Sequence, residues 1–593
     1  MNNIFKAGVF SLIACAFVAC DDVFEPLPEN NLPIDFMVQN STYAENTLGN
    51  VYAYMPAFDV NNLSEVATDD AVHNQADNSW RRIASGSWTS QFNPTNRWEM
   101  ARMCIQYCNL ILSVVDEVAW VKDPVANVCF RDRFYGEAHA LRGILMYNLL
   151  QAHAGVDASG QLLGIPVVTA FEDGSSNFNV PRDTYADCYQ AMMEDFNTAL
   201  EYLPDDFHSY DLYTNPNALD ELKKRYPEIT EGIANRVFGE TFGGRMCGQI
   251  VKAFKSRAAL MAASPAFAQS GVTWQDAADA AADVLKGING IAGLDPDGLT
   301  WYADPNMKDL NAGICPKEVI WRTSKGESND LEKTYFPPTL YGSGRVNPSH
   351  NLAMAFPMAN GYPTSDPKSG YDDQNPYDNR DPRFYHYIIH NGALEGSTNA
   401  VINTAADSPT NDGLEKIATS TRTGYYMKKH LRMDVNTGVG GSETKQFHYT
   451  ARLRYTEFFL NYAEAMNEAQ GPMASGSAGY SAYDVVKALR QRAGVGADNG
   501  DEYLESIKGD KEKMRELIRN ERRLELCFEG FRFYDLRRWK ANLNETVQGI
   551  RIEGGVYTPF DVETRNFKDY MIYGPIPYSE TLKFSNLQQN AGW

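Results

Sequence analysis

The chain has 593 residues, a formal net charge of −22 at pH 7 and no cluster of Lys and Arg that offsets this acidity. A protein this acidic repels a phosphate backbone, which excludes nucleic acid as a partner. Apolar residues make up 43% of the chain and charged residues 22%, as in ordinary globular proteins. Aromatic residues reach 12%, a content that suits sugar stacking and core packing equally.

The N-terminus predicts an exported, lipid-anchored protein. Lys6 precedes an apolar run, residues 7–19, that is too short to span a bilayer and has the length of a signal-peptide core. The run ends in Phe-Val-Ala-Cys, a lipobox pattern in which Cys20 becomes the acylated first residue of the mature chain. We therefore expect a signal peptide over residues 1–19 and a Pro-containing tether over residues 20–40. The alternative is ordinary secretion with cleavage at another site.

Four helix starts share one pattern: a Ser or Thr, an acidic residue three positions on, and a small residue four positions after that. The hydroxyl caps the first-turn amides, the acid favours the positive helix end, and the small residue permits close packing. A longer helix rich in small residues precedes the last three starts, over residues 131–154, 248–268 and 452–470. The four starts are Thr42/Glu45/Gly49, Thr184/Asp187/Ala191, Thr273/Asp276/Ala280 and Ser481/Asp484/Ala488.

These helical hairpins, with small residues at their crossings, are the unit of tetratricopeptide-type solenoids. Because the four copies are irregularly spaced, we predict a mainly α fold. It is an irregular four-unit tetratricopeptide-like helical superhelix with a long loop-rich insertion carrying a few short strands. The predicted parts are an N-terminal helical part (41–294, with a loop insertion at 57–96), the loop-rich insertion (295–441) and a C-terminal helical part (442–593).

The two insertions are the predicted ligand-binding regions. The first insertion, residues 57–96, is polar, and the second, residues 295–441, is dense in Gly, Pro, Asn and Asp with strand-like runs at 319–323 and 384–389. A glycan site needs exposed aromatic platforms flanked by Arg, Asn and Asp. We predict ligand contacts, with both indoles exposed on one face, for Trp80, Arg81, Trp88, Asn78, Tyr335 and Tyr341. The alternative for each aromatic is that it anchors its loop to the core.

A charged block, residues 511–540, follows the last hairpin. Apolar spacing predicts a helix over 511–528, a C-cap at Gly530 and a second helix over 531–539. An enzyme interpretation pairs Glu521 with Glu525 as catalytic carboxylates. We favour an Arg–carboxylate network that locks the two helices and includes Glu529 and Arg537.

Motifs of known catalytic and cofactor-binding sites are missing from the sequence. It contains no GxGxxG, P-loop, GxSxG or HExxH. We therefore predict a binding protein and not an enzyme, with no catalytic residue, no cofactor and no metal. A glycosidase is the less favoured alternative, because the many Asp and Glu pairs do not single out one site.

Four further motifs carry a family resemblance. They are ERRLELCFEGFRFYDLRRW (521–539), PIPYSETLKFSNLQQNAGW (575–593), NRDPRF (379–384) and GIPVV (164–168). With them the chain resembles the SusD/RagB family of nutrient-binding outer-membrane lipoproteins over nearly its whole length. The resemblance implies a protein anchored in outer-membrane lipid through acylated Cys20, facing the cell exterior. Such a protein captures an oligo- or polysaccharide and passes it to a TonB-dependent SusC-like transporter.

The resemblance also limits what can be predicted of the binding site. It implies that the two insertions hold the glycan, but it does not identify the residues. The RagB branch implies the alternative ligand, an oligopeptide.

Overall fold

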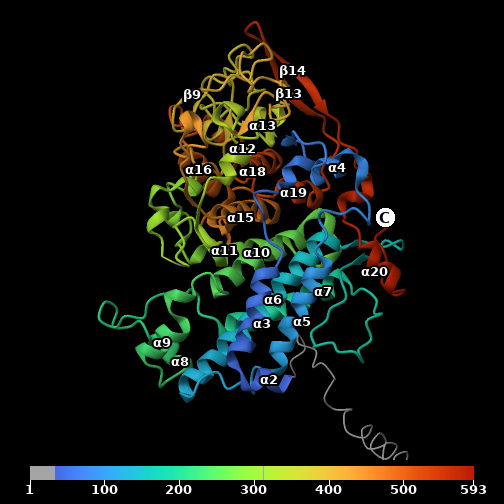
Figure 1. Ribbon diagram of the computed structural model, residues 1–593, viewed down its shortest axis with the longest axis vertical. Coiled ribbons are helices and arrows are strands. Elements are labelled where there is room, and N and C mark those ends of the chain that lie inside the picture. Colours follow the sequence, from blue (N-terminus) through green and yellow to red (C-terminus); the bar gives the residue numbers. More distant parts are fainter. Residues whose placement is uncertain (1–33, 312) are drawn as a thin grey trace, which may run out of the picture.

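The computed structural model describes residues 34–311 and 313–593. The predicted signal peptide and Cys20 lie outside the described residues. The fold is mainly helical, as predicted, with long loops and short two-stranded sheets (Figure 1). Among the helices of the described residues, none is both long and apolar enough to cross a membrane.

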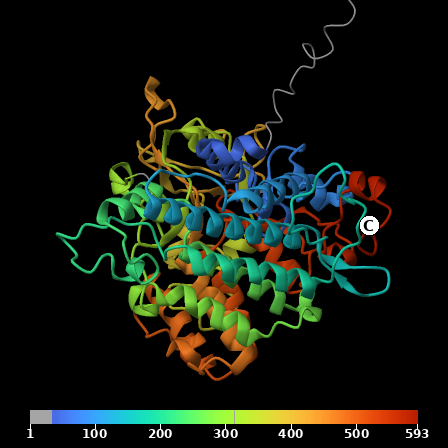
Figure 2. The same ribbon diagram turned by 90° about the horizontal axis from the view of Figure 1, so that it is seen from below.

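Long helices stack against one another in chain order. Helices α6 and α7, α10 and α11, and α15 and α16 form hairpins, while α7 contacts α10 and α11 contacts α15. Seen from below, the helices form successive rows from the blue N-terminal ones through cyan and green to orange (Figure 2). This arrangement is consistent with the predicted superhelix. The helices are α2 (Ile34–Gln39), α3 (Ser41–Tyr54), α4 (Ser79–Arg82), α5 (Trp98–Val114), α6 (Pro124–His153), α7 (Tyr185–Tyr202), α8 (Asp220–Arg225), α9 (Glu231–Phe238), α10 (Gly248–Ala263), α11 (Trp274–Lys286), α12 (Asp330–Tyr335), α13 (His350–Ala355), α14 (Pro382–Tyr387), α15 (Tyr455–Gln470), α16 (Ala482–Arg492), α17 (Glu502–Ile507), α18 (Lys511–Glu525), α19 (Arg532–Arg538) and α20 (Tyr578–Lys583).

Three of the four predicted helix caps are present. Thr184, Thr273 and Ser481 accept hydrogen bonds from the third amide of α7, α11 and α16. The prediction for Thr42 is wrong, because Asn40 caps α3: its backbone is extended, and its Oδ1 accepts from Tyr43 N at 3.2 Å.

The end of the predicted tether, residues 34–39, is also part of the fold. It forms α2, whose Met37 is buried in the hydrophobic core between the stacked helices.

The second insertion lies at the upper end of the molecule, beside the long hairpin of β13 and β14 (Figure 1). The predicted strand at 319–323 is confirmed as β4, but the strand at 384–389 is mostly the helix α14. Pro382 fixes the first turn of α14, and the Asp381 side chain caps it. The strands are β1 (Ala71–His73), β2 (Gly155–Val156), β3 (Leu162–Leu163), β4 (Val319–Arg322), β5 (Gly326–Ser328), β6 (Val346–Pro348), β7 (Ile388–Ile389), β8 (Leu394–Glu395), β9 (Ala400–Val401), β10 (Tyr426–Met427), β11 (Gln446–His448), β12 (Ala451–Arg454), β13 (Val547–Glu553) and β14 (Val556–Glu563).

Two hydrophobic cores support this architecture. The first lies between the stacked helices and contains most of their buried side chains. The second lies beneath both insertions, and α18 and α19 contribute to it. The charged block therefore joins the loop-rich part to the helices.

The helix α18 ends at Glu525, before the predicted C-cap at Gly530. Lys429 and Arg454 donate to the carbonyl oxygen of Glu525, and His430 contacts that of Phe528 at 2.8 Å. These side chains satisfy carbonyl groups at the helix end and permit the early stop.

Candidate functional site

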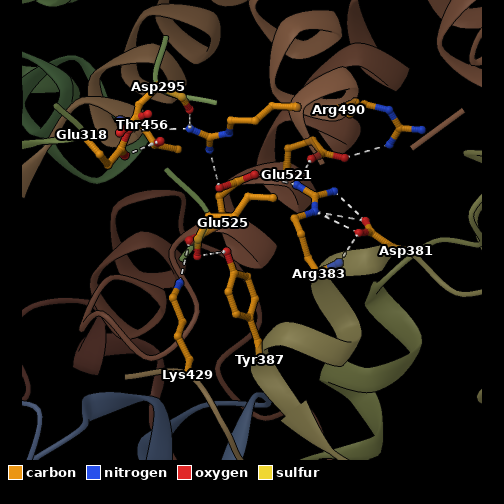
Figure 3. Close-up of polar contacts among 12 residues, drawn as sticks. Asp295, Glu318, Asp381, Arg383, Tyr387, Lys429, Thr456, Arg490, Glu521 and Glu525 are labelled. Carbon is orange, nitrogen blue, oxygen red and sulfur yellow. Dashed lines mark hydrogen bonds and ion pairs between the residues drawn. The ribbon is translucent and has the colours of Figure 1, made fainter. Parts of the chain in front are cut away.

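The charged block forms a buried ion-pair network (Figure 3). The Arg383 guanidinium, from the NRDPRF motif, lies 2.6 Å from Asp381, 2.7 Å from Glu521 and 2.9 Å from Glu525. Arg490 binds the second oxygen of Glu521 at 2.7 Å. Arginine side chains form ion pairs with both Glu521 and Glu525. The two glutamates therefore have the partners of a structural network and not of a catalytic carboxylate pair.

Arg537 is not part of this network, contrary to the prediction. Glu529 pairs instead with Arg454 and Lys429, each at 2.7 Å. The only hydrogen bond from the Arg537 guanidinium to a described residue joins its Nε to Ile572 O at 2.8 Å. The side chain lies among aromatic rings on α19 and the first insertion, away from the acidic residues.

The predicted exposure of the two indoles is wrong. Trp80 is 5% exposed and Trp88 2%, and both lie in the second core. Their rings contact Phe533 at centroid distances of 5.2 and 5.7 Å, and Trp88 also packs on Trp593 at 4.9 Å. Their Nε1 atoms donate to Asn62 O and Asn93 Oδ1. Residues distant in sequence therefore cover the apolar surface of the two indoles, which the polar loop around them leaves uncovered.

Asn78 and Arg81 also make internal contacts. Asn78 Oδ1 accepts from Arg81 N at 3.1 Å and so caps α4. Arg81 Nε donates to Glu563 Oε1 at 2.8 Å, and Arg422 from the second insertion binds the same oxygen. Glu563 thereby ties the two insertions to β14.

The two predicted tyrosines occupy different environments. Tyr335 is 1% exposed and donates from its hydroxyl to Val60 O at 2.6 Å, so it anchors one insertion to the other. Tyr341 is 63% exposed and has a positive φ of 59°. A left-handed backbone is costly for an aromatic residue and is found at functional sites more often than elsewhere.

The two insertions meet beside Tyr341, at the pairing of β1 with β6. His73 is opposite Val346, and Asn74 N donates to Arg345 O at 3.1 Å. Asn74 Nδ2 donates to Ser343 O and Gly344 O, both at 2.9 Å, in the turn that follows Tyr341. We call this surface, formed by Asn74, Tyr341 and Arg345, the insertion junction.

The insertion junction carries positive charge. Arg345 is half-buried and has no carboxylate within 4.0 Å among the described residues; its contact is Asn74 Oδ1 at 3.4 Å. Burial, reinforced by Arg345, lowers the pKa of His73 to about 4. The imidazole is therefore neutral at pH 7, and Arg345 remains as a donor for hydroxyl or carboxylate oxygens.

The sequence prediction did not include Asn74 or Arg345. Both lie in the predicted regions, but their role depends on the β1–β6 pairing, which joins segments far apart in sequence. The polar run around Asn74 was the available signal.

Two family models match the chain. Residues 317–593 match the model described as the SusD family, and residues 27–219 match one described as "starch-binding associating with outer membrane". A curated relative, SusD-like protein P2 of Formosa agariphila, is 31% identical over 169 residues, or 28% of this chain and 29% of that protein.

Solved structures share the fold across nearly the whole chain. A SusD-like protein from Bacteroides fragilis superposes with a TM-score of 0.68 at 24% identity, covering 95% of this chain and all of that one. A laminarin-binding SusD-like protein gives 0.54 at 18% identity, covering 94% and 100%. These structures share with this chain a helical superhelix beneath a loop-rich face. The chain belongs to the SusD/RagB family.

Proposed function

We propose that this protein captures a glycan at the cell surface and passes it to a SusC-like TonB-dependent transporter in the outer membrane. The observation that carries the proposal is the insertion junction, in a chain whose two halves both match SusD models. The protein holds the glycan without cleaving it. Acylated Cys20 anchors it in outer-membrane lipid, facing the cell exterior.

The insertion junction combines the two kinds of contact that sugars use. The exposed ring of Tyr341 offers a face to the apolar C–H groups of a sugar. Arg345 supplies donors for the ring hydroxyls at its edge, while Asn74 holds the adjoining turn through Ser343 O and Gly344 O.

The test replaces the exposed ring and leaves the scaffold intact. Tyr341→Ala should weaken glycan binding about tenfold to a hundredfold, roughly 1–3 kcal/mol, while the melting temperature stays unchanged. Tyr213→Ala is the matched control, because Tyr213 is 95% exposed on a different loop. Affinity electrophoresis with starch and laminarin, followed by calorimetry on the glycan that binds, gives the readout.

Three other results would change the assignment. Binding of oligopeptides from a library, with no glycan retained, would favour the RagB-like alternative. Release of reducing sugar from the glycan panel would make the protein a glycosidase. Equal glycan affinity of Tyr341→Ala and wild type would move the site away from the insertion junction.

A further inference from the structure

A cavity of about 350 Å³ lies where the stacked helices meet the C-terminal block. Its walls come from α6, α10, α15, α19 and β12 and from residues of the first insertion. The volume is in the range of small-molecule sites, about 300–1,000 Å³. None of Asn74, Tyr341 and Arg345 lines it, so it is separate from the insertion junction.

The lining of this cavity contains seven arginines and four acidic residues. Some of these arginines are paired: Arg454 with Glu529, Arg522 with Asp535, and Arg538 with Glu464. Arg97, Arg452 and Arg537 have no carboxylate within 4.0 Å among the described residues. Positive charge is therefore left uncompensated inside the protein.

Arg537 is the most exceptional of the three. It is 4% exposed, and neither of its Nη atoms has a hydrogen-bond partner among residues 34–311 and 313–593. Its Cζ lies 5.2 Å from the ring centre of Phe533 and 5.4 Å from that of Trp88. Aromatic faces offset part of the charge but accept no strong hydrogen bond, so four N–H donors remain unused.

Arg452 and Arg97 extend the same pattern. The Arg452 guanidinium stacks over Trp321 at 4.5 Å, and its Nε is buried without a partner in the described part of the chain. Among the described residues, the Arg97 guanidinium donates only to neutral oxygens, on Asn148, Gln151 and Tyr534. Burial, which Tyr534 opposes and nearby Arg97 reinforces, lowers the pKa of Arg537 to about 10, so this guanidinium remains charged at pH 7.

The rest of the lining suits a hydroxylated ligand. Tyr147 accepts from Gln151 Nε2 at 3.0 Å and keeps its own proton available to donate. Trp321 and Phe531 add aromatic surface. Three guanidinium groups favour an anionic ligand. The aromatic rings, amides and phenol beside them suit a sugar ring.

We propose that this cavity is a second binding site, which takes the anionic group of a small acidic sugar. Arg537 and Arg452 bind the charge, and Tyr147 and the amides bind hydroxyl groups. The charge is carried by a carboxylate, as in a uronic acid, or by a sulfate ester. The site is independent of the insertion junction and does not require that surface to bind glycans.

The test is calorimetric titration of the full-length protein with four probes: D-glucuronate, N-acetylglucosamine 6-sulfate, D-glucose and sodium sulfate. We expect one or both charged sugars to bind at least about tenfold more tightly than glucose and than sulfate ion. The charged sugar that binds more tightly identifies the anionic group as a carboxylate or a sulfate ester. Equal binding of sodium sulfate would mean an adventitious ion only, and equal binding of glucose or no binding of either charged sugar would also overturn the proposal.

Variants assign the binding to the cavity. Arg537→Gln and Arg452→Gln should each weaken the charged sugar about tenfold or more. Arg551→Gln is the matched control, because Arg551 is an exposed arginine paired with Glu553 on β13. A purely structural Arg537 would instead lower the melting temperature and leave affinity per folded molecule intact. Should Arg537→Gln fail to fold, the half-exposed Arg452 decides: unchanged affinity in Arg452→Gln overturns the proposal.

Discussion

The charge of a buried carboxyl group in this protein depends on the groups around it. Burial raises the pKa of Glu464, but the guanidinium of Arg538, 2.6 Å from both carboxylate oxygens, overcomes this and lowers the pKa to about 2. For Glu65, burial dominates and raises the pKa to about 7. Gly530 N donates to Glu65 Oε1 at 2.6 Å, while Oε2 is buried without a partner in the described residues, and Asp70 and Glu529 are nearby negative groups.

Glu65 should therefore make the protein less stable at alkaline than at mildly acidic pH. Its pKa of about 7 in the folded chain exceeds its ordinary value of 4.5, so the folded chain retains a proton that the unfolded chain has released. The contribution of Glu65 to the free energy of unfolding is fully present below pH 4.5. It is lost as the pH rises through 7, by roughly 3 kcal/mol in all. Glu65→Gln keeps the shape without the charge and should remove most of this loss, measured by urea unfolding at pH 5 and pH 8.

A matched variant distinguishes this effect from a general loss of charge. Glu464→Gln removes a carboxylate that Arg538 holds ionised. It should destabilise the protein at pH 8, because a folded pKa of about 2 adds stability that is present above the ordinary value near 4.5 and lost as the pH falls towards 2. Identical pH profiles for Glu65→Gln and wild type would show that Glu65 is ionised in the folded protein.

Glycines determine how closely individual helices approach. At Gly143 of α6, an added Cβ would lie 2.6 Å from the Phe196 ring on α7. At Gly49 of α3, no atom lies within 4 Å of that position. The first glycine thus permits a close helix crossing, and the second has no such role, although the pattern Thr42/Glu45/Gly49 predicts close packing there.

Exchanging each of these glycines for alanine gives opposite results. Gly143→Ala should destabilise the protein by roughly 1–3 kcal/mol, because a buried aromatic ring must move. Gly49→Ala should stabilise it by about 0.5–1 kcal/mol through helix propensity. Urea midpoints of the two variants check the pair. If Gly143→Ala left the urea midpoint unchanged, α6 and α7 would be able to separate at little cost in free energy.

Local patterns predicted most of the helices, but they did not reveal partners that lie far apart in the sequence. Thr273 and Ser481 signal their helices with residues only three positions away. The run at 384–389 has the composition of a strand, but Pro382 fixes a helical turn before it, and Arg383 then reaches Asp381. Capping depends on neighbours in the sequence, whereas the ion pairs of Arg383 with α18 depend on the whole fold.

The proposed binding face shows the same limit at the scale of the whole molecule. The fold brings the two predicted insertions together at β1 and β6. The sequence did not indicate which aromatics are exposed, because the partners that cover Trp80 and Trp88 are Phe533, Phe567 and Trp593, more than 400 residues away. Of the six predicted residues, Tyr341 alone combines high exposure with a place in the insertion junction.

The C-terminal segment holds the helices and the second core together. Asn590 Nδ2 donates to the carbonyl groups of His153 and Gly574, and Asn590 Oδ1 accepts from Arg182 at 2.7 Å. Trp593 packs on Trp88. The C-terminal residues are therefore packed into the described fold.

Cys20→Ala should release a folded, binding-competent protein from the membrane. Each buried acyl CH₂ contributes about 0.8 kcal/mol to anchoring, and the described helices offer no span to replace the acyl chains. The variant should lose labelling by radioactive palmitate and move to the soluble fraction. Its melting temperature and glycan affinity should match those of wild type, because the anchor precedes the described fold. Cys15→Ala is the control, since Cys15 belongs to the predicted signal peptide and its loss should leave labelling intact. Equal palmitate incorporation by Cys20→Ala and wild type would contradict the lipobox.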